Sequence, residues 1–202
     1  YGCTAGQGSS CGGALDAATA GASIVIQESQ FAENAAPAGD GGAVSAVGSG
    51  FPSIDAGVQR STFIGNRARR GGALVLTDGG TITNSTIVGN TASVLGGGIL
   101  AVSQNLSAGI YLTLTGNAAP EGANAALIGR DTNLLFSVFA DPAGGGENCV
   151  GDGSNSFVLG HADDDSCDDP AAAGPAELGP LVDNGGRTLT REPLPGSPLI
   201  DA

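Results

Sequence analysis

A nine-residue phrase recurs along the chain and constrains its fold more than any other feature. It reads aliphatic residue, two variable residues, Ser, one variable residue, Phe or Ile, two variable residues, Asn. Clear copies occupy residues 26–34, 58–66 and 82–90, and a worn fourth copy ends at Asn117. The asparagines recur after 32, 24 and 27 residues. Repeats of this length indicate a solenoid in which each repeat is one supersecondary unit.

The residues between these phrases indicate strands and turns rather than helices. The chain contains 36 glycines, which interrupt every window in which a helical period would develop. Short runs of Val, Ile, Thr and Phe are bounded by Gly, Asn and Asp, as in strands separated by turns. A Gly-Gly-Ala phrase, suited to a tight corner, occurs at 12–14, 41–43 and 71–73, with variants at 97–99 and 122–123. The sequence therefore predicts an all-β fold, a parallel β-helix.

Stacking of the coils assigns a place to each repeated residue. Successive coils of a parallel β-helix lie about 4.8 Å apart, so equivalent residues stand above one another. The repeated Ile/Val and Phe/Ile positions then fill the interior. The asparagines lie at turns, where each side-chain amide can bond its own turn and the Asn of the neighbouring coil. This predicted ladder comprises Asn34, Asn66, Asn90 and Asn117.

The chain of 202 residues is long enough for one domain with a continuous core. We expect an N-terminal coil or cap over residues 1–23 and the repeat array over 24–128. Residues 129–170 are expected to form the last coils with a disulfide loop. Residues 171–202 are rich in proline and glycine, and we expect them to run irregularly along the outside as a cap over one end or a flank.

Four cysteines form two local pairs, Cys3 with Cys11 and Cys149 with Cys167. Their spacing does not match a zinc ribbon, and their even number predicts two disulfides, one at each end of the array. Disulfides imply an oxidising compartment. The chain begins at Tyr1 and contains no signal-like or membrane-spanning apolar stretch. We therefore expect a mature or trimmed secreted chain without membrane insertion.

The charge balance argues against nucleic acids and anionic membranes as partners. Twenty acidic residues face seven cations, all of them Arg, and the formal net charge is −13. The one basic cluster, Arg67, Arg69 and Arg70, is interpreted either as a solvated edge or as a contact for an anion or a carboxylated sugar.

An acidic run near the end of the chain is a candidate Ca²⁺ site, because hard cations prefer several oxygen ligands. It consists of Asp163, Asp164, Asp165, Asp168 and Asp169. It lacks the alternating Asp spacing of a preorganised calcium loop, so a solvated acidic loop held by a disulfide is the favoured interpretation.

The sequence offers no credible catalytic set. A lyase acting on uronates needs a base beside Ca²⁺-binding acids, and a glycosidase needs two carboxylates at a fixed separation. The acids of the array are scattered over different repeat positions, and His161 is the one histidine. Glu28, Arg60 and Asn84 share one repeat position and predict an outward polar ladder with a salt bridge of little energetic value.

The repeats and the tail carry a resemblance to known bacterial surface proteins. The paired phrases Phe-x-x-Asn and Gly-Gly-Ala resemble the repeats of the polymorphic outer-membrane protein family. The run from Leu178 to Thr190 and the ending Leu194-Pro195-Gly196-Ser197-Pro198-Leu199-Ile200-Asp201-Ala202 resemble the end of choice-of-anchor Q domain proteins. Asn148-Cys149 and Ser166-Cys167 resemble that family's paired cysteines. The resemblance implies an exported bacterial right-handed parallel β-helix, often joined to an anchoring segment.

These observations favour a structural or adhesive protein at the bacterial cell surface or outside the cell. Its partners would be a surface glycan or protein, or further copies of the chain in a filament or surface layer. The alternative is a carbohydrate-active β-helix enzyme, similar to a polysaccharide lyase or hydrolase. No cofactor is expected, apart from the Ca²⁺ considered above.

Overall fold

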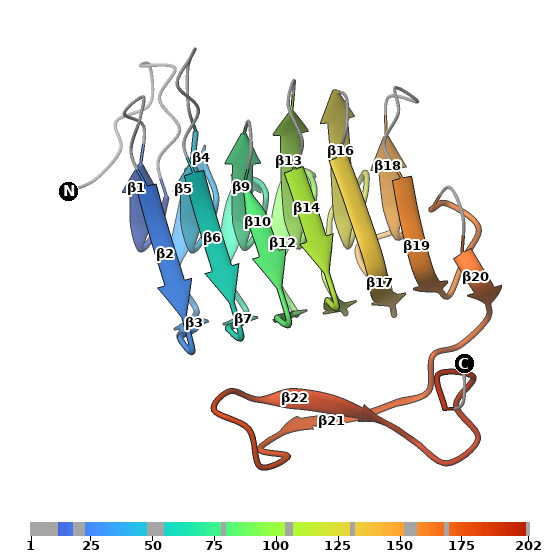
Figure 1. Cartoon of the computed structure of the whole chain (residues 1–202). Coiled ribbons are helices and arrows are strands. Elements are labelled where there is room, and N and C mark those ends of the chain that lie inside the picture. Colours follow the sequence, from blue (N-terminus) through green and yellow to red (C-terminus); the bar gives the residue numbers. More distant parts are fainter. Residues whose placement is uncertain are drawn as a thin grey trace.

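The computed structural model is a solenoid of parallel β-strands with a separate hairpin along one flank (Figure 1). The structure describes residues 12–17, 23–47, 55–77, 80–103, 107–129, 132–151, 157–167 and 170–200. Cys3 and Cys11, Asp168 and Asp169, and most of the predicted N-terminal cap lie outside these residues. Among the described residues no helix has the length and hydropathy needed to span a membrane.

Each coil runs through three walls and an arm. The first wall contains β2 (Ser23–Gln27), β6 (Asp55–Gln59), β10 (Thr81–Thr83), β14 (Ser107–Ile110) and the first halves of β17 (Thr132–Ala140) and β19 (Phe157–Ala162). The second wall contains β3 (Gln30–Ala32), β7 (Thr62–Ile64), β11 (Thr86–Val88), β15 (Thr113–Thr115), the second halves of β17 and β19, and β20 (Pro170–Ala173). All pairings between successive coils in these walls are parallel.

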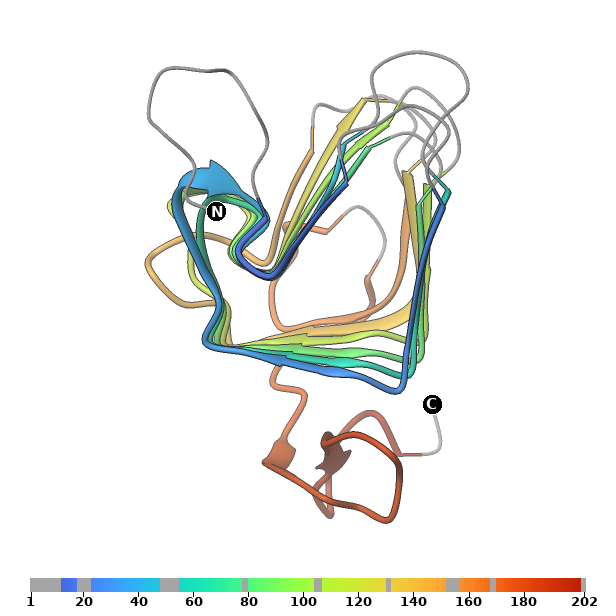
Figure 2. The ribbon, with the colours of Figure 1, turned by 90° about the vertical axis from the view of Figure 1, so that its left-hand side faces the viewer.

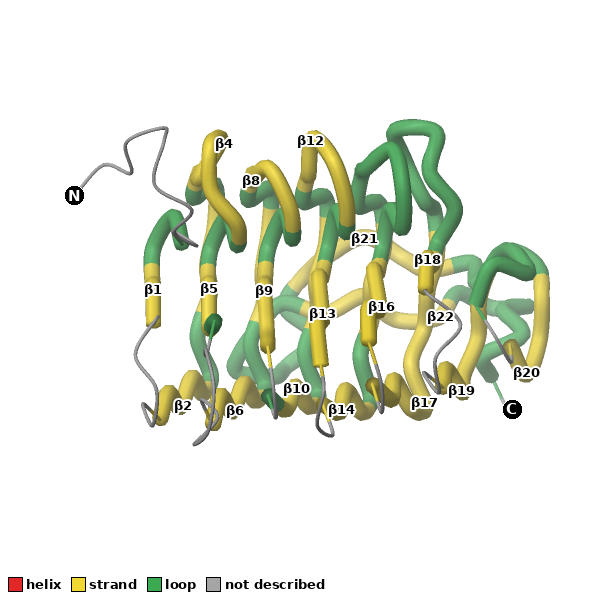
Figure 3. Tube along the Cα trace, turned by 90° about the horizontal axis from the view of Figure 1, so that it is seen from above, coloured by secondary structure: helices red, strands yellow, loops and turns green. Residues whose placement is uncertain are grey.

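The rest of each coil returns the chain to the first wall. The arm contains β4 (Ala35–Asp40), β8 (Arg67–Arg70) and β12 (Thr91–Leu95). The third wall contains β1 (Leu15–Ala17), β5 (Val44–Ala46), β9 (Leu74–Thr77), β13 (Ile99–Ser103), β16 (Ala125–Gly129) and β18 (Cys149–Gly151), which lie side by side in Figure 3. Seen from the N-terminal end, the chain turns clockwise as it recedes, so the solenoid is right-handed (Figure 2). The predicted fold class is confirmed.

The core is a stack of thin aliphatic and aromatic layers, as the repeat predicted. The buried residues of the second wall are Phe63, Ile87, Leu114 and Phe139, each in register with the next. Phe31 stacks on Phe63 with ring centroids 5.1 Å apart. The same hydrophobic cluster includes inward residues of the other walls, such as Val58 and Leu74. Each intact phrase therefore contributes two residues to one layer, as Val58 and Phe63 show.

The Gly-Gly phrase marks a corner at which neighbouring backbones nearly touch. A β-carbon on Gly72 would lie 2.0 Å from the carbonyl oxygen of Gly97 in the next coil. Gly71 also has a φ of +59°, in the left-handed region that glycine tolerates best. Both requirements explain why the phrase begins with two glycines.

The predicted Asn ladder is present at the second corner, between the second wall and the arm. Asn66 Nδ2 donates to Asn90 Oδ1 at 2.9 Å, and Asn90 Nδ2 donates to Asn117 Oδ1 at 2.9 Å. Asn34 begins the series by donating to Asn66 Oδ1 at 2.9 Å. The backbone N–H of Asn66 also donates to Asn90 Oδ1. Each amide thus satisfies buried groups of the coil before it.

The ladder then changes corner, which the sequence did not indicate. Pro142 stands in register with Asn117 in the fifth coil and has no amide to offer. Asn117 Nδ2 instead donates to Asn124 Oδ1 at 2.7 Å, and Asn124 Nδ2 donates to Asn148 Oδ1 at 2.5 Å. Asn124 and Asn148 occupy the third position of the Gly-Gly-Ala phrase.

The C-terminal segment differs from the irregular cap that was predicted. β21 (Leu178–Val182) and β22 (Thr190–Pro193) pair as an antiparallel hairpin, here called the strap. The strap lies along the outside of the second wall and therefore covers a flank, one of the two expected places (Figure 2). Thr62 Oγ1 donates to the carbonyl oxygen of Leu189 at 3.0 Å, and Arg191 Nη1 donates to Thr115 Oγ1 at 2.6 Å.

Candidate functional site: the first corner

One residue per coil stands at the first corner, between the first and second walls. We call this set the corner row. It consists of Glu28, Arg60, Asn84, Tyr111 and Phe136, with φ angles of 49°, 44°, 49°, 56° and 51°. Their predecessors pair in register from coil to coil, so the five residues lie in one line along the solenoid axis. The in-register position of Glu28, Arg60 and Asn84 confirms that part of the sequence prediction.

A second series of residues fixes the backbone directly beneath the row. Ser61 Oγ donates to the carbonyl oxygen of Gln59 at 2.8 Å and accepts a hydrogen bond from the backbone N–H of Ser29 at 3.2 Å. Ser85 and Ser137 make the equivalent bonds to their own coils. In the coils that carry this Ser, the hydrogen bond joins its side chain to the carbonyl oxygen two residues earlier and fixes the turn. The residue between them, which belongs to the row, therefore points away from the solenoid.

The two left-handed corners of the coil are filled differently. The second corner uses Gly65, Gly89 and Gly116 at φ angles of 61°, 64° and 62°, with Glu33 and Asp141 only in the outer coils. In the five described coils that form the row the first corner carries no glycine, and Gly160 occupies it only in the coil beyond the row. A side chain in the left-handed region costs about 1–2 kcal/mol relative to the right-handed region. The chain therefore keeps side chains at the first corner where glycine would be less strained, and such backbone outliers often mark functional positions.

The N-terminal end of the corner row is a network of ion pairs. Arg60 Nη2 lies 3.2 Å from Glu28 Oε1, and Arg187 of the strap loop places Nη1 2.8 Å from Glu28 Oε2. Both arginines are exposed, so each pair contributes about 0–1 kcal/mol to stability. The predicted salt bridge is confirmed. Its main effect is that Glu28 compensates the charge of Arg60.

The C-terminal end of the corner row is an exposed aromatic pair. The Tyr111 and Phe136 rings stack with centroids 5.6 Å apart and an interplanar angle of 23°. Their residues are 59% and 56% exposed, unusually high values for stacked aromatic side chains. The row ends there, because Gly160 in the next coil pairs directly with Ser137 and nothing stands opposite Phe136.

Sequence reasoning missed this aromatic end. The fourth repeat carries Leu112 where the other copies carry Ser, so the position of Tyr111 was not recognised. The usable signal was spacing alone: Tyr111 precedes the Leu-Thr-Gly-Asn ending by the same number of residues as Asn84 precedes Ile-Val-Gly-Asn.

The arginine cluster of the arm is partly neutralised. Arg70 forms a two-point ion pair with the buried carboxylate of Asp40, with Nε 2.9 Å from Oδ1. This hydrogen bond is also the main reason that the pKa of Arg70 is raised. Arg67 and Arg69 are exposed, and Arg67 lines a shallow hollow together with Glu33. The structure thus places carboxylates beside two of the three cations.

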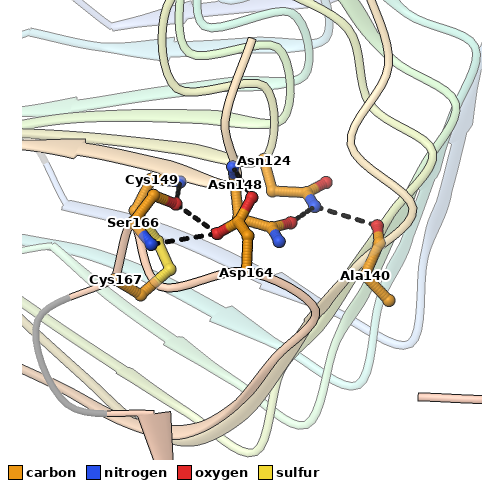
Figure 4. Close-up of a disulfide and its surroundings, with 7 residues drawn as sticks. All are labelled: Asn124, Ala140, Asn148, Cys149, Asp164, Ser166 and Cys167. Atoms are coloured by element: carbon orange, nitrogen blue, oxygen red, sulfur yellow. Dashed lines mark hydrogen bonds between the residues drawn. A yellow bond between two sulfur atoms is a disulfide. The ribbon is translucent and has the colours of Figure 1, made fainter. Parts of the chain in front are cut away.

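The predicted Cys149–Cys167 disulfide is present in the last coils, with Cα atoms 5.1 Å apart (Figure 4). Asp164 lies beside it and accepts hydrogen bonds from the backbone N–H groups of Asn148 at 3.0 Å and Ser166 at 3.1 Å. Partial burial alone would raise the pKa of Asp164, but hydrogen bonds from Ser166 and Asn148 outweigh it and lower the pKa.

Asp163 likewise accepts backbone hydrogen bonds, close to the start of the strap. Its carboxylate accepts hydrogen bonds from the backbone N–H groups of Asp141 at 2.7 Å and Ala176 at 2.9 Å. Beside it, buried His161 places Nε2 2.7 Å from the carbonyl oxygen of Gly174. Within the described ranges no three His, Cys, Asp or Glu side chains converge to hold a metal ion. The two carboxylates are thus engaged by backbone groups, and Asp165 is exposed beside them.

No family model, curated protein or solved structure matches this chain. The resemblance to the polymorphic outer-membrane and choice-of-anchor Q proteins therefore remains an expectation from the sequence.

Proposed function

We propose that the protein is a non-catalytic adhesive solenoid whose contact surface is the corner row. The observation that carries this proposal is the contrast between the two corners. The same left-handed backbone is filled mostly by glycine at the second corner and by five larger side chains at the first. Packing does not explain these side chains, because four of the five residues are exposed and Glu28 is only half-buried.

The shape of the site supports adhesion better than catalysis. The row is a straight, convex edge of the solenoid rather than a cleft (Figure 2). Enzymes generally enclose their reacting groups in a concave pocket that excludes water. A convex line of polar and aromatic groups instead offers repeated contacts to a long partner, and such contacts add up through multivalency.

The proposal includes an extracellular or bacterial cell-surface location. The Cys149–Cys167 disulfide supports it, because disulfides persist in oxidising compartments. The strongly acidic composition keeps such a chain soluble and separate from anionic surfaces.

The proposal is tested by replacing the row with the residue that the second corner uses. The variant carries Asn84→Gly, Tyr111→Gly and Phe136→Gly, and the matched control carries Glu33→Gly at the second corner. Beads coated with each protein pass over immobilised uncharged polysaccharides, acidic polysaccharides, matrix proteins and the chain itself. We expect wild-type and control beads to be retained on at least one surface and the row variant to lose at least tenfold of that retention. Absence of retention on every surface, or equal retention of the row variant, would overturn the proposal.

A further inference from the structure

We infer that the ligand of the corner row is an uncharged linear glycan lying parallel to the solenoid axis; this inference rests on the proposed adhesive function. It names the chemical class of the partner, which the contrast between the two corners does not supply.

The geometry of the row fits a repeating polymer. Its residues stand one per coil, and coils in register are spaced by about 4.8 Å, the separation of paired strands. One sugar unit of an extended glycan has a length close to this spacing. Each unit of such a polymer therefore meets one side chain of the row.

The groups on the row are those that bind sugars. The amide of Asn84 and the phenol of Tyr111 donate and accept hydrogen bonds, as sugar hydroxyls require. The Tyr111–Phe136 pair presents apolar ring surface for the C–H groups of a sugar, because both residues are more than half exposed although their rings stack.

The charge distribution favours an uncharged glycan over an acidic one. Arg60, the row's cation, is paired with Glu28, which also binds Arg187. The chain as a whole carries a formal charge of −13. Two arginines share the carboxylate of Glu28, so the preference for an uncharged polymer rests on the other part of the row. Asn84, Tyr111 and Phe136 offer a polyanion no cation, and the net charge of the chain repels it, whereas an uncharged polymer loses nothing to this field.

The shape of the corner argues against a folded protein partner. A stable protein interface buries about 1,200–2,000 Å² and needs a desolvated centre. The corner row has one residue per coil and follows an outward turn of the backbone between two walls (Figure 2), so a flat protein surface would bury little area along it. A flexible linear glycan follows such an edge along its whole length.

The row is also fixed before any ligand arrives. The left-handed backbone of Tyr111 and Phe136 is held by hydrogen bonds such as Leu112 N–H to Ser137 Oγ at 3.1 Å. Stacking restricts both rings further. Binding therefore orders few additional groups, which removes a large part of the usual entropic penalty.

The chain itself provides a site-specific probe for the test. It contains two tyrosines and no tryptophan, so a Tyr1→Phe variant leaves Tyr111 as the one tyrosine emitter. This variant is titrated with uncharged β-linked oligosaccharides of two to eight units and with polyuronate oligosaccharides of equal length. We expect the uncharged series to change Tyr111 fluorescence, with an affinity that rises up to about five units and is unaffected by salt.

A second variant separates the aromatic contacts from folding. Phe136→Asn keeps a residue that tolerates the left-handed region, and Glu33→Asn is its control at the second corner. We expect Phe136→Asn to weaken binding of the uncharged oligosaccharide at least tenfold and Glu33→Asn to leave it unchanged. If beads bind only acidic polysaccharides or proteins and the uncharged series leaves Tyr111 unaffected, the glycan inference is wrong while the adhesive proposal stands. If no surface retains the beads, both are wrong.

Discussion

Leu112 occupies the space that a side chain on Gly109 would fill. A β-carbon on Gly109 would lie 2.7 Å from Leu112 Cδ1 and 2.4 Å from Leu134 Cδ2. Gly109 is in register with Ile82, an aliphatic core position, and Leu112 stands at the position of the corner serines. Compared with the other coils, the fourth coil has Gly109 in place of the aliphatic core residue and Leu112 in place of the corner Ser. The side chain of Leu112 therefore fills, from the corner, the core space that Gly109 leaves.

This exchange predicts strong coupling between the two positions. Gly109→Val alone should destabilise the protein by about 1–3 kcal/mol through overpacking against Leu112. Leu112→Ser alone should cost about 3 kcal/mol because it leaves a cavity. The double variant restores the pattern of the other coils and should lose less than the sum by at least 1 kcal/mol. Urea denaturation of the four proteins measures this cycle, and additive effects would show that the sites are independent.

The Asn ladder predicts a large effect from one interior amide. Asn90→Ala removes the acceptor for the backbone N–H and Nδ2 of Asn66, both of which are buried. We expect the free energy of unfolding to fall by about 2–4 kcal/mol, since buried donors without partners are costly. Ser93→Ala in the same coil is exposed and serves as the control, with an expected change within about 0.5 kcal/mol. Equal effects of both changes would contradict a stabilising role of the ladder.

The two corners predict opposite responses to exchange of glycine and side chain. Tyr111→Gly removes left-handed strain of about 1–2 kcal/mol but also loses stacking worth about 0.5–1.5 kcal/mol, so stability should change little. Gly116→Ala introduces strain at a φ of +62° and should destabilise by about 1 kcal/mol, although its nearest neighbouring atom would be 4.0 Å away. Thermal denaturation of the two variants compares the two corners within the fourth coil. If Tyr111→Gly destabilised the protein as much as the truncation of a core residue does, the row would have a structural role.

The Cys149–Cys167 bond closes a loop with a sequence separation of 18 residues. The Cys149→Ser/Cys167→Ser variant should lose about 3 kcal/mol, the usual effect for a loop of this length. Calorimetry of the wild type with and without reductant, compared with the variant under the same conditions, separates this bond from the other cysteines. A variant as stable as the oxidised wild type would show that the hydrogen bonds around Asp164 suffice.

The lowered pKa of Asp164 predicts a loss of stability in acid. Because the folded-state pKa lies below the unfolded value of about 3.9, the contribution is fully present above that value. It is lost as the pH falls through the folded-state pKa. The stability of wild type should therefore decrease more steeply below about pH 4 than that of Asp164→Asn. Denaturation midpoints between about pH 2 and 7 measure the difference, and parallel curves would assign the acid sensitivity to other carboxyl groups.

The sequence predicted the features that depend on regular repetition. The spacing of Asn34, Asn66 and Asn90 predicted both the coil and the ladder because identical residues in register can bond one another. The change of corner to Asn124 was not predictable from one phrase, since it requires space beside Gly98, which has no side chain. The strap was predicted to be irregular because Pro180 and Pro193 cannot donate backbone hydrogen bonds, yet a two-stranded hairpin tolerates them at its edges.

The residues of the candidate site were also predicted only in part. Glu28, Arg60 and Asn84 were found because they belong to intact copies of the phrase. Tyr111 and Phe136 were not, because their significance lies in exposure and ring stacking, which only the folded coils reveal.

Each interior ladder amide ties its coil to both neighbouring coils. Nδ2 of Asn66 donates forward to Asn90 Oδ1 and back to the carbonyl oxygen of Phe31, and Nδ2 of Asn90 donates forward to Asn117 Oδ1 and back to the carbonyl oxygen of Phe63. Loss of either neighbouring coil therefore leaves a buried N–H group without one of its acceptors, a rare and costly situation in proteins. Proteolytic trimming into the array is thus costly from both ends. During synthesis each coil becomes fully bonded only when the next one has been added.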